Sequence, residues 1–330
     1  MKAMILRQPR DIDAKPLIME DLPVPEPGSN QLRLKVHVCA LCHTDLHIVE
    51  GEIAPHLSPV APGHQIVGVV DRLGEGAIRY SLGQRLGVPW LYRTDQTCRY
   101  CQKGLENLCE HGKFTGYDVN GGYAEYHVVD EAFAYPIPEC FSDIEAAPLL
   151  CAGVIGYRAM RLSEIKPGGR LGLYGFGASA HISLQIAHHW GCEAYVYTRG
   201  ENHKQLAREL GAKWVGSVGE ETPLLDSAII FAPAGGLVVE ALKRLDKGGT
   251  LALAGIYMTP IPQFEYPLLY GERTVRSVAN STRQDALDLL KVAGEIPVRT
   301  ETQLFDLDGL NQALADLKHG KIKGSGVVKI

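Results

Sequence analysis

The chain has 330 residues, a length that suggests about two domains, and its 45% hydrophobic and 22% charged residues are typical of a globular protein. The formal net charge of −5 is spread along the chain, which argues against a nucleic-acid-binding surface or a basic membrane-binding patch. No apolar run has the form of a signal peptide or approaches the roughly 20 residues of a membrane span. We therefore expect a soluble, cytoplasmic protein that binds neither nucleic acid nor membrane.

The first half of the chain has the patterns of β-strands separated by loops rich in glycine and proline. Residues 32–38 alternate apolar and polar side chains with a period of two, as a half-buried strand does. Residues 66–70 and 123–129 show a similar pattern. Residues 1–151 are therefore predicted to form a β-rich domain with irregular loops, where functional residues usually lie.

Residues 42–47, with the sequence CHTDLH, concentrate polar side chains that are costly to bury without partners. A soft divalent metal is a natural partner, because zinc binds Cys thiolate and neutral His, and a catalytic zinc keeps one position open. Two further candidate ligands are His64 and Cys151. Together with Cys42 they predict a zinc site with two thiolates and one imidazole. Cys39 ends an apolar strand, so we interpret it as a core residue.

Three more cysteines, Cys98, Cys101 and Cys109, lie close together in a polar stretch of a chain without a secretion signal, where disulfides are uncommon. Their spacing is typical of a closed structural zinc site, which needs a fourth ligand. Asp95 precedes Cys98 by the same interval that separates Cys98 from Cys101, and zinc accepts a carboxylate oxygen. We predict a structural zinc in a lobe at about residues 93–112. The alternative is a metal-free lobe in which Asp95 is a solvated loop carboxylate.

The pattern changes at residues 171–174, which form a short apolar strand. Gly175, Gly177 and Ala178 follow in a dinucleotide-binding fingerprint whose third glycine is replaced by alanine, and an apolar helix comes next. Gly175 permits the tight turn, and Gly177 lets the backbone approach a pyrophosphate. The N-terminus of the helix offers free N–H groups to the phosphates.

Alternating strands and helices continue after this fingerprint. Strands are predicted at 194–199, 214–215, 227–231, 250–256 and 274–279, with helices at 203–210 and 236–245. This alternation predicts a doubly wound parallel sheet of six strands. Two more helices at 285–292 and 309–318 and a final strand at 325–330 follow, and we expect the final strand to return to the sheet of the first domain.

The end of the second strand of this unit bears on the choice of dinucleotide. A site that prefers NAD commonly has Asp or Glu there to bind the ribose 2′-hydroxyl. This chain has Thr198 and Arg199 instead, and a guanidinium matches the geometry of a 2′-phosphate. The sequence therefore favours NADP over NAD. The alternative is a solvated Arg199 on a loop that tolerates NAD.

These motifs resemble, over essentially the whole chain, the zinc-dependent alcohol dehydrogenases of the medium-chain dehydrogenase/reductase superfamily. The resemblance rests on the 42–45 and 62–64 motifs, the cysteine lobe, Cys151, and the glycine fingerprint. It implies an α/β protein in which a GroES-like catalytic domain, at 1–151 and 280–330, is interrupted by a Rossmann domain at 152–279.

The resemblance also implies roles for individual side chains around the predicted catalytic zinc. Thr44 matches the hydroxyl that takes the alcohol proton, and His47 the histidine that passes it to solvent. Asp45 matches the carboxylate that orients the histidine ligand of the metal. His43 matches a residue near the cofactor pyrophosphate, and Trp90 resembles a wall of the substrate pocket.

Three positions depart from the pattern of this family. Gln65 follows the histidine ligand where glutamate is usual, which leaves the site less negative. Asp95 stands in place of the first of four lobe cysteines. Ser325 stands where a basic residue often faces the pyrophosphate, and Lys323 or Arg283 could substitute for it.

The implied reaction is hydride transfer between a small alcohol or aldehyde and a nicotinamide, with zinc as the Lewis acid. By the same resemblance we expect a homotetramer or a homodimer. One alternative is a zinc-free quinone or enoyl reductase on the same fold, which should lack the three predicted zinc ligands. Another is a non-catalytic zinc and nucleotide-binding scaffold or sensor, which would need no proton relay.

Overall fold

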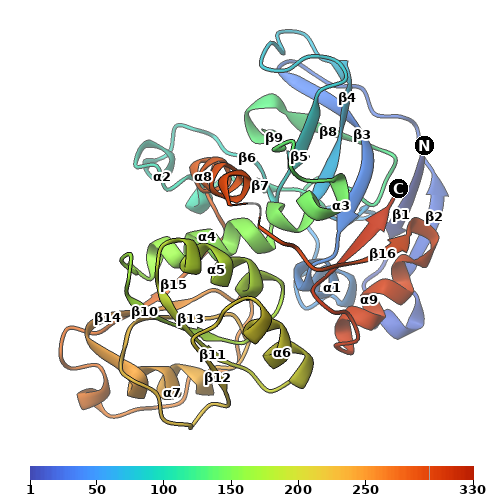
Figure 1. The fold of residues 1–330 in the computed structure, drawn as a ribbon. Helices are drawn as coiled ribbons and strands as arrows, with labels where there is room; N and C mark the ends of the chain where they lie inside the picture. The colour runs from blue at the N-terminus through green and yellow to red at the C-terminus, as the bar shows by residue number, and fades with distance from the viewer. Residues whose placement is uncertain (297) are drawn as a thin grey trace. The chain divides into compact units, whose positions relative to one another are not determined.

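The computed structural model describes residues 1–296 and 298–330, which divide into two compact units. One unit comprises Met1–Cys151 and Ser281–Ile330, and the other comprises Ala152–Asn280. The chain therefore leaves the first unit once and later returns to it, as the colours of Figure 1 show. Within the described ranges, no helix combines the length and the apolar character needed to cross a membrane.

The first unit is built on a mainly antiparallel sheet of seven strands. In order across the sheet these are β16 (Thr302–Asp306), β17 (Ser325–Lys329), β3 (Gln31–Ala40), β4 (Ile66–Leu73), β5 (Arg85–Val88) and β9 (Tyr135–Pro136), with β8 (Tyr126–Asp130) paired to β3. The alternation predicted for β3 is confirmed, because Leu32, Leu34 and Val36 are buried in the core. The final strand β17 pairs antiparallel with β3, so the end of the chain lies in this sheet.

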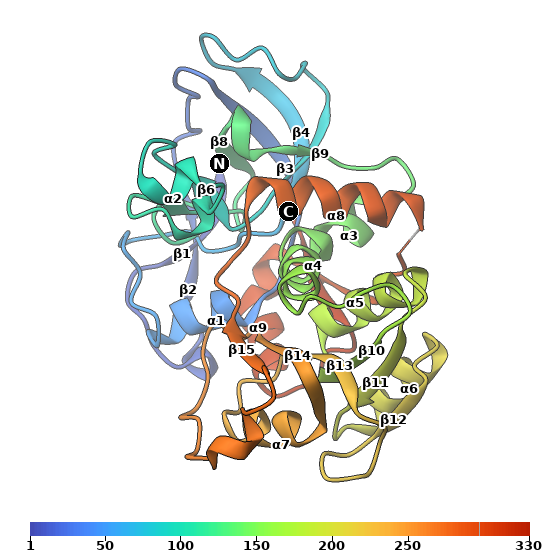
Figure 2. The ribbon, with the colours of Figure 1, turned by 90° about the vertical axis from the view of Figure 1, so that its left-hand side faces the viewer.

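Shorter elements surround this sheet. They are β1 (Lys2–Leu6), β2 (Leu17–Asp21), α1 (His43–Glu50), β6 (Leu91–Arg93), α2 (Arg99–Gln102), β7 (Lys113–Phe114), α3 (Asp143–Ala146), α8 (Arg283–Glu295) and α9 (Leu310–Lys318), with short 3-10 turns between them. Helices α1 and α9 lie side by side in Figures 1 and 2, and both contribute leucines to the core. The two predicted C-terminal helices are confirmed as α8 and α9.

One strand begins later than the sequence predicts. The expected strand at 123–129 starts at Tyr126 in β8. Residues 121–123 instead donate their backbone N–H groups to the carbonyls of residues 61–63, at 2.6–3.1 Å. These hydrogen bonds take the place of pairing with β3. They hold the loop before β8 against residues 61–63, which lie next to His64.

The second unit contains the predicted six-stranded parallel sheet. Its order is β12 (Trp214–Gly216), β11 (Glu193–Tyr197), β10 (Arg170–Tyr174), β13 (Leu225–Ile230), β14 (Leu245–Leu253) and β15 (Thr274–Ser277). The chain order reverses between β10 and β13, which is the switch point where open α/β sheets bind ligands.

Helices cover both faces of this sheet. They are α4 (Ala152–Leu162), α5 (Ala178–His189), α6 (Glu201–Glu209) and α7 (Gly236–Arg244). Figures 1 and 2 show α4 and α5 on one side of the sheet and α7 on the other. Helix α4 was not predicted from the sequence. The connection 217–224 between β12 and β13 is described throughout and contains no helix.

Candidate functional site

The polar stretch at 42–47 forms the start of helix α1. Cys42 is the N-cap residue, and its Sγ accepts the backbone N–H of Thr44 at 3.4 Å. Asp45 bonds back to the N-cap, because its Oδ2 accepts the backbone N–H of Cys42 at 3.0 Å. This reciprocal cap satisfies free N–H groups at the helix start and fixes the direction of the Cys42 side chain.

The three predicted catalytic-zinc ligands meet in the first unit. The Sγ atoms of Cys42 and Cys151 are 3.8 Å apart, and the ligand atoms of these two and His64 all lie within 4.8 Å of one another. His64 is completely buried, and its Nδ1 is 2.8 Å from Asp45 Oδ1. Its Nε2 has no hydrogen-bond partner among the described residues. A buried nitrogen left unpaired beside two thiols suits a soft metal ion.

The charges around these residues are strongly coupled. Burial opposes protonation of His64, but the Asp45 carboxylate outweighs it and raises the pKa of His64 from 6.5 to about 10 when no metal is present. A hydrogen bond with Cys151 lowers the pKa of the Cys42 thiol, although burial acts in the opposite direction. A metal ion would displace the proton from His64 Nε2, because zinc ligands bind in their deprotonated forms.

The predicted proton-relay residues lie on one side of helix α1. Thr44 and His47 are three residues apart, and Thr44 Oγ1 is 3.6 Å from Cys42 Sγ. His47 Nδ1 forms a hydrogen bond with the carboxylate of Glu52, which follows the helix. His43 is exposed, with its ring centroid 6.5 Å from that of His47. The contact between His47 and Glu52 was not predicted from the sequence, because Glu52 lies beyond the C-cap Gly51. Helical spacing does not indicate which side chains meet there.

Aromatic rings lie against the histidine ligand. The ring centroid of Trp90 is 4.9 Å from that of His64, edge to face, and Trp90 stacks on Phe114 at 5.2 Å. Tyr117 is 5.7 Å from Trp90. The position of Trp90 beside a metal-ligand candidate suits a pocket wall. The contact between Phe114 and Trp90 was not predicted, because no sequence pattern shows that β7 pairs beside Trp90.

The four predicted lobe ligands also converge. The carboxylate of Asp95 and the sulfurs of Cys98, Cys101 and Cys109 lie within 4.8 Å of one another. Asp95 Oδ1 accepts the backbone N–H groups of Thr97 and Cys98 at 2.9 Å each, and these bonds lower the pKa of Asp95. Since Oδ1 makes both turn bonds, Oδ2 is not needed for them. A carboxylate that is ionised and held toward three thiols can complete a tetrahedral zinc site.

The glycine fingerprint lies between β10 and α5 in the second unit. Gly175 has a positive φ of 87°, and a Cβ there would lie 3.0 Å from the backbone nitrogen of Ala232. A Cβ on Gly177 would meet open space, so a ligand can approach its backbone. No side chain in the described residues caps the N-terminus of α5, which begins at Ala178. The open approach and the uncapped helix suit a pyrophosphate.

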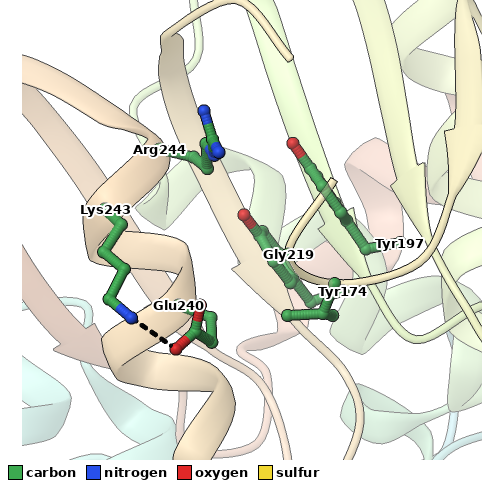
Figure 3. Close-up of a pocket in the computed structure, with 7 residues that line it drawn as sticks. Tyr174, Tyr197, Gly219, Glu240, Lys243 and Arg244 are labelled. Atoms are coloured by element: carbon green, nitrogen blue, oxygen red, sulfur yellow. Dashed lines mark hydrogen bonds and ion pairs between the residues drawn. The ribbon is translucent and has the colours of Figure 1, made fainter. Parts of the chain in front are cut away.

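A cavity of about 230 Å³ lies in the second unit, lined by residues of β10, β11, α7 and the connection after β12. Tyr174 and Tyr197, the last residues of β10 and β11, line it with their rings stacked at 4.3 Å (Figure 3). The buried hydroxyl of Tyr174 has no hydrogen-bond partner in the described part of the chain. Lys243, paired with Glu240 at 2.7 Å, and Arg244 complete the lining from α7. The cavity therefore lies between the ends of β10 and β11, the last turn of α7 and the connection that follows β12.

The predicted ribose-contacting residues follow Tyr197 directly. The strand predicted at 194–199 ends at Tyr197, so Thr198 and Arg199 lie in the connection to α6. Thr198 is buried and donates its backbone N–H to Gly216, whereas Arg199 is exposed. The side chain of Arg199 is therefore accessible just after the carboxyl end of β11.

Comparisons with known proteins agree with this arrangement. Residues 28–139 match the alcohol dehydrogenase GroES-like domain. The chain is 44% identical to a probable alcohol dehydrogenase, AdhA, of Mycobacterium tuberculosis, over 100% of this chain and 97% of that protein. The chain belongs to the alcohol dehydrogenase family of the medium-chain dehydrogenase/reductase superfamily. This dehydrogenase is also 32% identical to an alcohol dehydrogenase of Geobacillus stearothermophilus, over the full length of both. A cinnamyl alcohol dehydrogenase of Sorghum bicolor has the same fold, with a TM-score of 0.91, 27% identity, and coverage of 99% and 97% of the two chains.

Gln65 follows His64 at the position where glutamate was expected. Gln65 is buried, and its Nε2 donates a hydrogen bond to the carbonyl of Leu41 at 2.9 Å. A carboxylate could not donate this bond. Gln65 Oε1 has no partner within the described residues. The amide thus ties the residue after His64 to the loop before Cys42 without adding charge.

The two basic residues considered as substitutes at Ser325 have other partners in this dehydrogenase. Arg283 Nη2 bonds to Glu106 Oε2 at 2.7 Å, and the backbone N–H of Arg283 bonds to the other carboxylate oxygen. Lys323 pairs with Glu301 at 3.4 Å. A pyrophosphate contact of Arg283 or Lys323 therefore stays a prediction, and it would compete with these ion pairs. The Arg283–Glu106 pair instead ties the start of α8 to the cysteine lobe.

Proposed function

We propose that this alcohol dehydrogenase depends on zinc and transfers hydride between a small alcohol or aldehyde and NADP. The observation that carries the proposal is the buried Nε2 of His64, which has no hydrogen-bond partner in the described ranges and lies beside the thiols of Cys42 and Cys151. These three residues would hold the catalytic zinc. The metal supplies Lewis acidity, which favours loss of the alcohol proton.

The residues of the chain prepare the site for this chemistry. Asp45 accepts a hydrogen bond from the Nδ1–H group of His64, so Nε2 is the nitrogen left to bind the metal. Thr44 offers a hydroxyl beside Cys42, and His47 with Glu52 offers a route for the proton toward solvent. Trp90 restricts the space beside His64 and helps to exclude water.

We further propose that the second unit binds the dinucleotide along the carboxyl ends of its strands. Gly177 and the N-terminus of α5 would bind the pyrophosphate, and the adenosine part would lie across the carboxyl ends of the strands toward the end of β11. Arg199 would bind the 2′-phosphate of NADP. His43 remains the candidate in the first unit for a pyrophosphate contact. In this proposal the first unit is the catalytic domain, and the protein forms a tetramer or a dimer.

The first test is zinc per chain on the purified protein, paired with turnover of benzaldehyde with NADPH and with NADH. Two zincs with turnover that is faster with NADPH would support both metal sites and the cofactor choice. One zinc with turnover would mean that the lobe holds no metal. Zinc without turnover on a broad panel of alcohols and aldehydes would favour a scaffold or sensor. Turnover of quinones without zinc would favour a zinc-free reductase.

Arg199→Asp is expected to reverse the cofactor preference. The change removes the guanidinium and places a carboxylate where NAD-preferring sites have one, so it repels the 2′-phosphate and can bind the 2′-hydroxyl. We expect the ratio of kcat/KM for NADPH to that for NADH to fall by about 100-fold, which corresponds to about 2.7 kcal/mol. Arg208→Asp makes the same charge change on the exposed face of α6 and should leave the ratio within about twofold. An equal effect of both variants would show that only net charge matters.

A further inference from the structure

A buried tyrosine lies directly behind the proposed catalytic metal site. Tyr123 has no exposed surface and is among the largest fully buried side chains of the described chain. Its hydroxyl donates to Asp45 Oδ2 at 3.1 Å, and it lies 3.4 Å from the carbonyl oxygen of Ala40. Burial, reinforced by the Asp45 charge, raises the pKa of Tyr123 well above its ordinary value, so the hydroxyl stays protonated.

The Asp45 carboxylate has two donors on each oxygen. Oδ1 receives His64 Nδ1 at 2.8 Å and the backbone N–H of Gly63 at 3.2 Å. Oδ2 receives the backbone N–H of Cys42 at 3.0 Å and the Tyr123 hydroxyl. Asp45 is itself completely buried, so its charge is stabilised by these four bonds rather than by water. Of the four donors, only the Tyr123 hydroxyl belongs to a residue outside the two ligand-bearing segments.

The backbone holds Tyr123 in this position from both sides. Its N–H donates to the carbonyl of Pro62 at 3.1 Å, and its carbonyl accepts the N–H of Met4 at 2.9 Å. The ring also lies close against Gly63, where an added Cβ would be 3.0 Å from the ring carbons. The hydroxyl therefore approaches Asp45 from a rigid support that does not depend on α1.

We propose that Tyr123 is a positioning residue for the catalytic metal, because its hydroxyl locks the Asp45 carboxylate in the orientation that holds His64. The inference rests on the proposed zinc site. Without the hydroxyl, Oδ2 keeps one donor, and the carboxylate can turn so that Oδ1 leaves His64 Nδ1. The imidazole then loses the partner that fixes its ring and its tautomer, and it binds zinc less firmly.

The test is the release of zinc from the purified holoenzyme to a colorimetric chelator. The release phase that is absent in Cys42→Ala identifies the catalytic site. Tyr123→Phe keeps the ring and removes only the hydroxyl, and it should speed this phase about tenfold, the lower end of the effect of groups that orient metal ligands. Release from the cysteine lobe should not change.

Two comparisons separate positioning from simple stabilisation. Tyr80→Phe is the matched control, because it removes a hydroxyl that donates to the carbonyl of Ala134 at 2.6 Å in the same unit. It should leave the catalytic phase within about twofold. In an Asp45→Asn background, Tyr123→Phe should add less than about twofold, since its effect acts through Asp45. Thermal unfolding should show that Tyr123→Phe destabilises the zinc-loaded protein more than the zinc-stripped protein.

Four results would overturn the inference. They are an unchanged catalytic phase in Tyr123→Phe, an equal acceleration in Tyr80→Phe, a full effect that persists with Asp45→Asn, and an equal loss of stability with and without zinc, which would reduce Tyr123 to a core residue. A wild-type protein whose zinc release does not respond to Cys42→Ala would instead overturn the zinc site itself, and the role of Tyr123 with it.

Discussion

Cys42→Ala is expected to remove one zinc per chain and to reduce alcohol oxidation by about 1000-fold or more. A Lewis-acid metal supplies several kcal/mol of transition-state stabilisation, and each 1.36 kcal/mol corresponds to about tenfold in rate. The variant leaves two ligands, Cys151 and His64, which cannot fix a zinc ion in a tetrahedral site. Metal analysis of the purified variant, together with steady-state turnover, checks the prediction.

The Cys42→Ala variant should still fold. Cys42 Sγ caps α1 by accepting the N–H of Thr44, and loss of such a cap costs about 0.5–2 kcal/mol. Cys39→Ala is the matched control, because Cys39 lies three residues away and is completely buried. It should retain zinc and most of the turnover at the cost of a small cavity. Zinc loss in Cys39→Ala, or normal turnover in Cys42→Ala, would contradict the assignment of ligand and core residue.

The candidate ligands of the catalytic metal are easier to predict from the sequence than the residues that hold those ligands in place. Cys42, His64 and Cys151 are recognisable as a set, because two thiolates and one imidazole are a typical ligand set of a catalytic zinc. The burial of Cys39 confirms its interpretation as a core residue. Tyr123 fits an ordinary strand pattern, and its hydroxyl gains a role only because residues 121–123 pair with 61–63. Such loop-to-loop hydrogen bonds have no periodic signal in the sequence.

In the fold as well, elements with a periodic sequence pattern were predictable and elements without one were not. The six parallel strands of the second unit were predictable, because short apolar runs alternate with helical patterns and a glycine fingerprint marks the first turn. Helix α4 was missed, since it follows Cys151 without a favoured N-cap residue and its first turns contain Gly153 and Gly156, which are poor helix formers. The ion pair of Arg283 could not be predicted for a related reason. Its partner Glu106 lies 177 residues away in the chain, and no local pattern connects them.

Asp95→Asn is expected to weaken zinc binding in the cysteine lobe by about 100-fold while it keeps the local turn. An amide oxygen can still accept the N–H groups of Thr97 and Cys98, as Asp95 Oδ1 does at 2.9 Å. The amide lacks the charge of a carboxylate and is not among the usual ligands of zinc. With zinc in excess, a 100-fold weaker site lowers the free energy of unfolding by about 2.7 kcal/mol. For a unit of this size, that loss lowers the Tm by about 5–10 °C.

Metal analysis after dialysis against a weak chelator, together with thermal unfolding in zinc buffers, measures both effects. Glu110→Gln is the matched control, because Glu110 is an exposed lobe carboxylate that pairs only loosely with Arg99, at 3.6 Å. It should change the Tm by little, since exposed ion pairs contribute about 0–1 kcal/mol. Asp95→Cys, which supplies a fourth thiolate, should bind zinc at least as tightly as the wild type. If Asp95→Asn and Glu110→Gln behaved alike, Asp95 would be only a turn residue. The three cysteines would then need a fourth ligand from elsewhere, and the ligand set would differ from the one that the sequence spacing and the converging side chains both indicate.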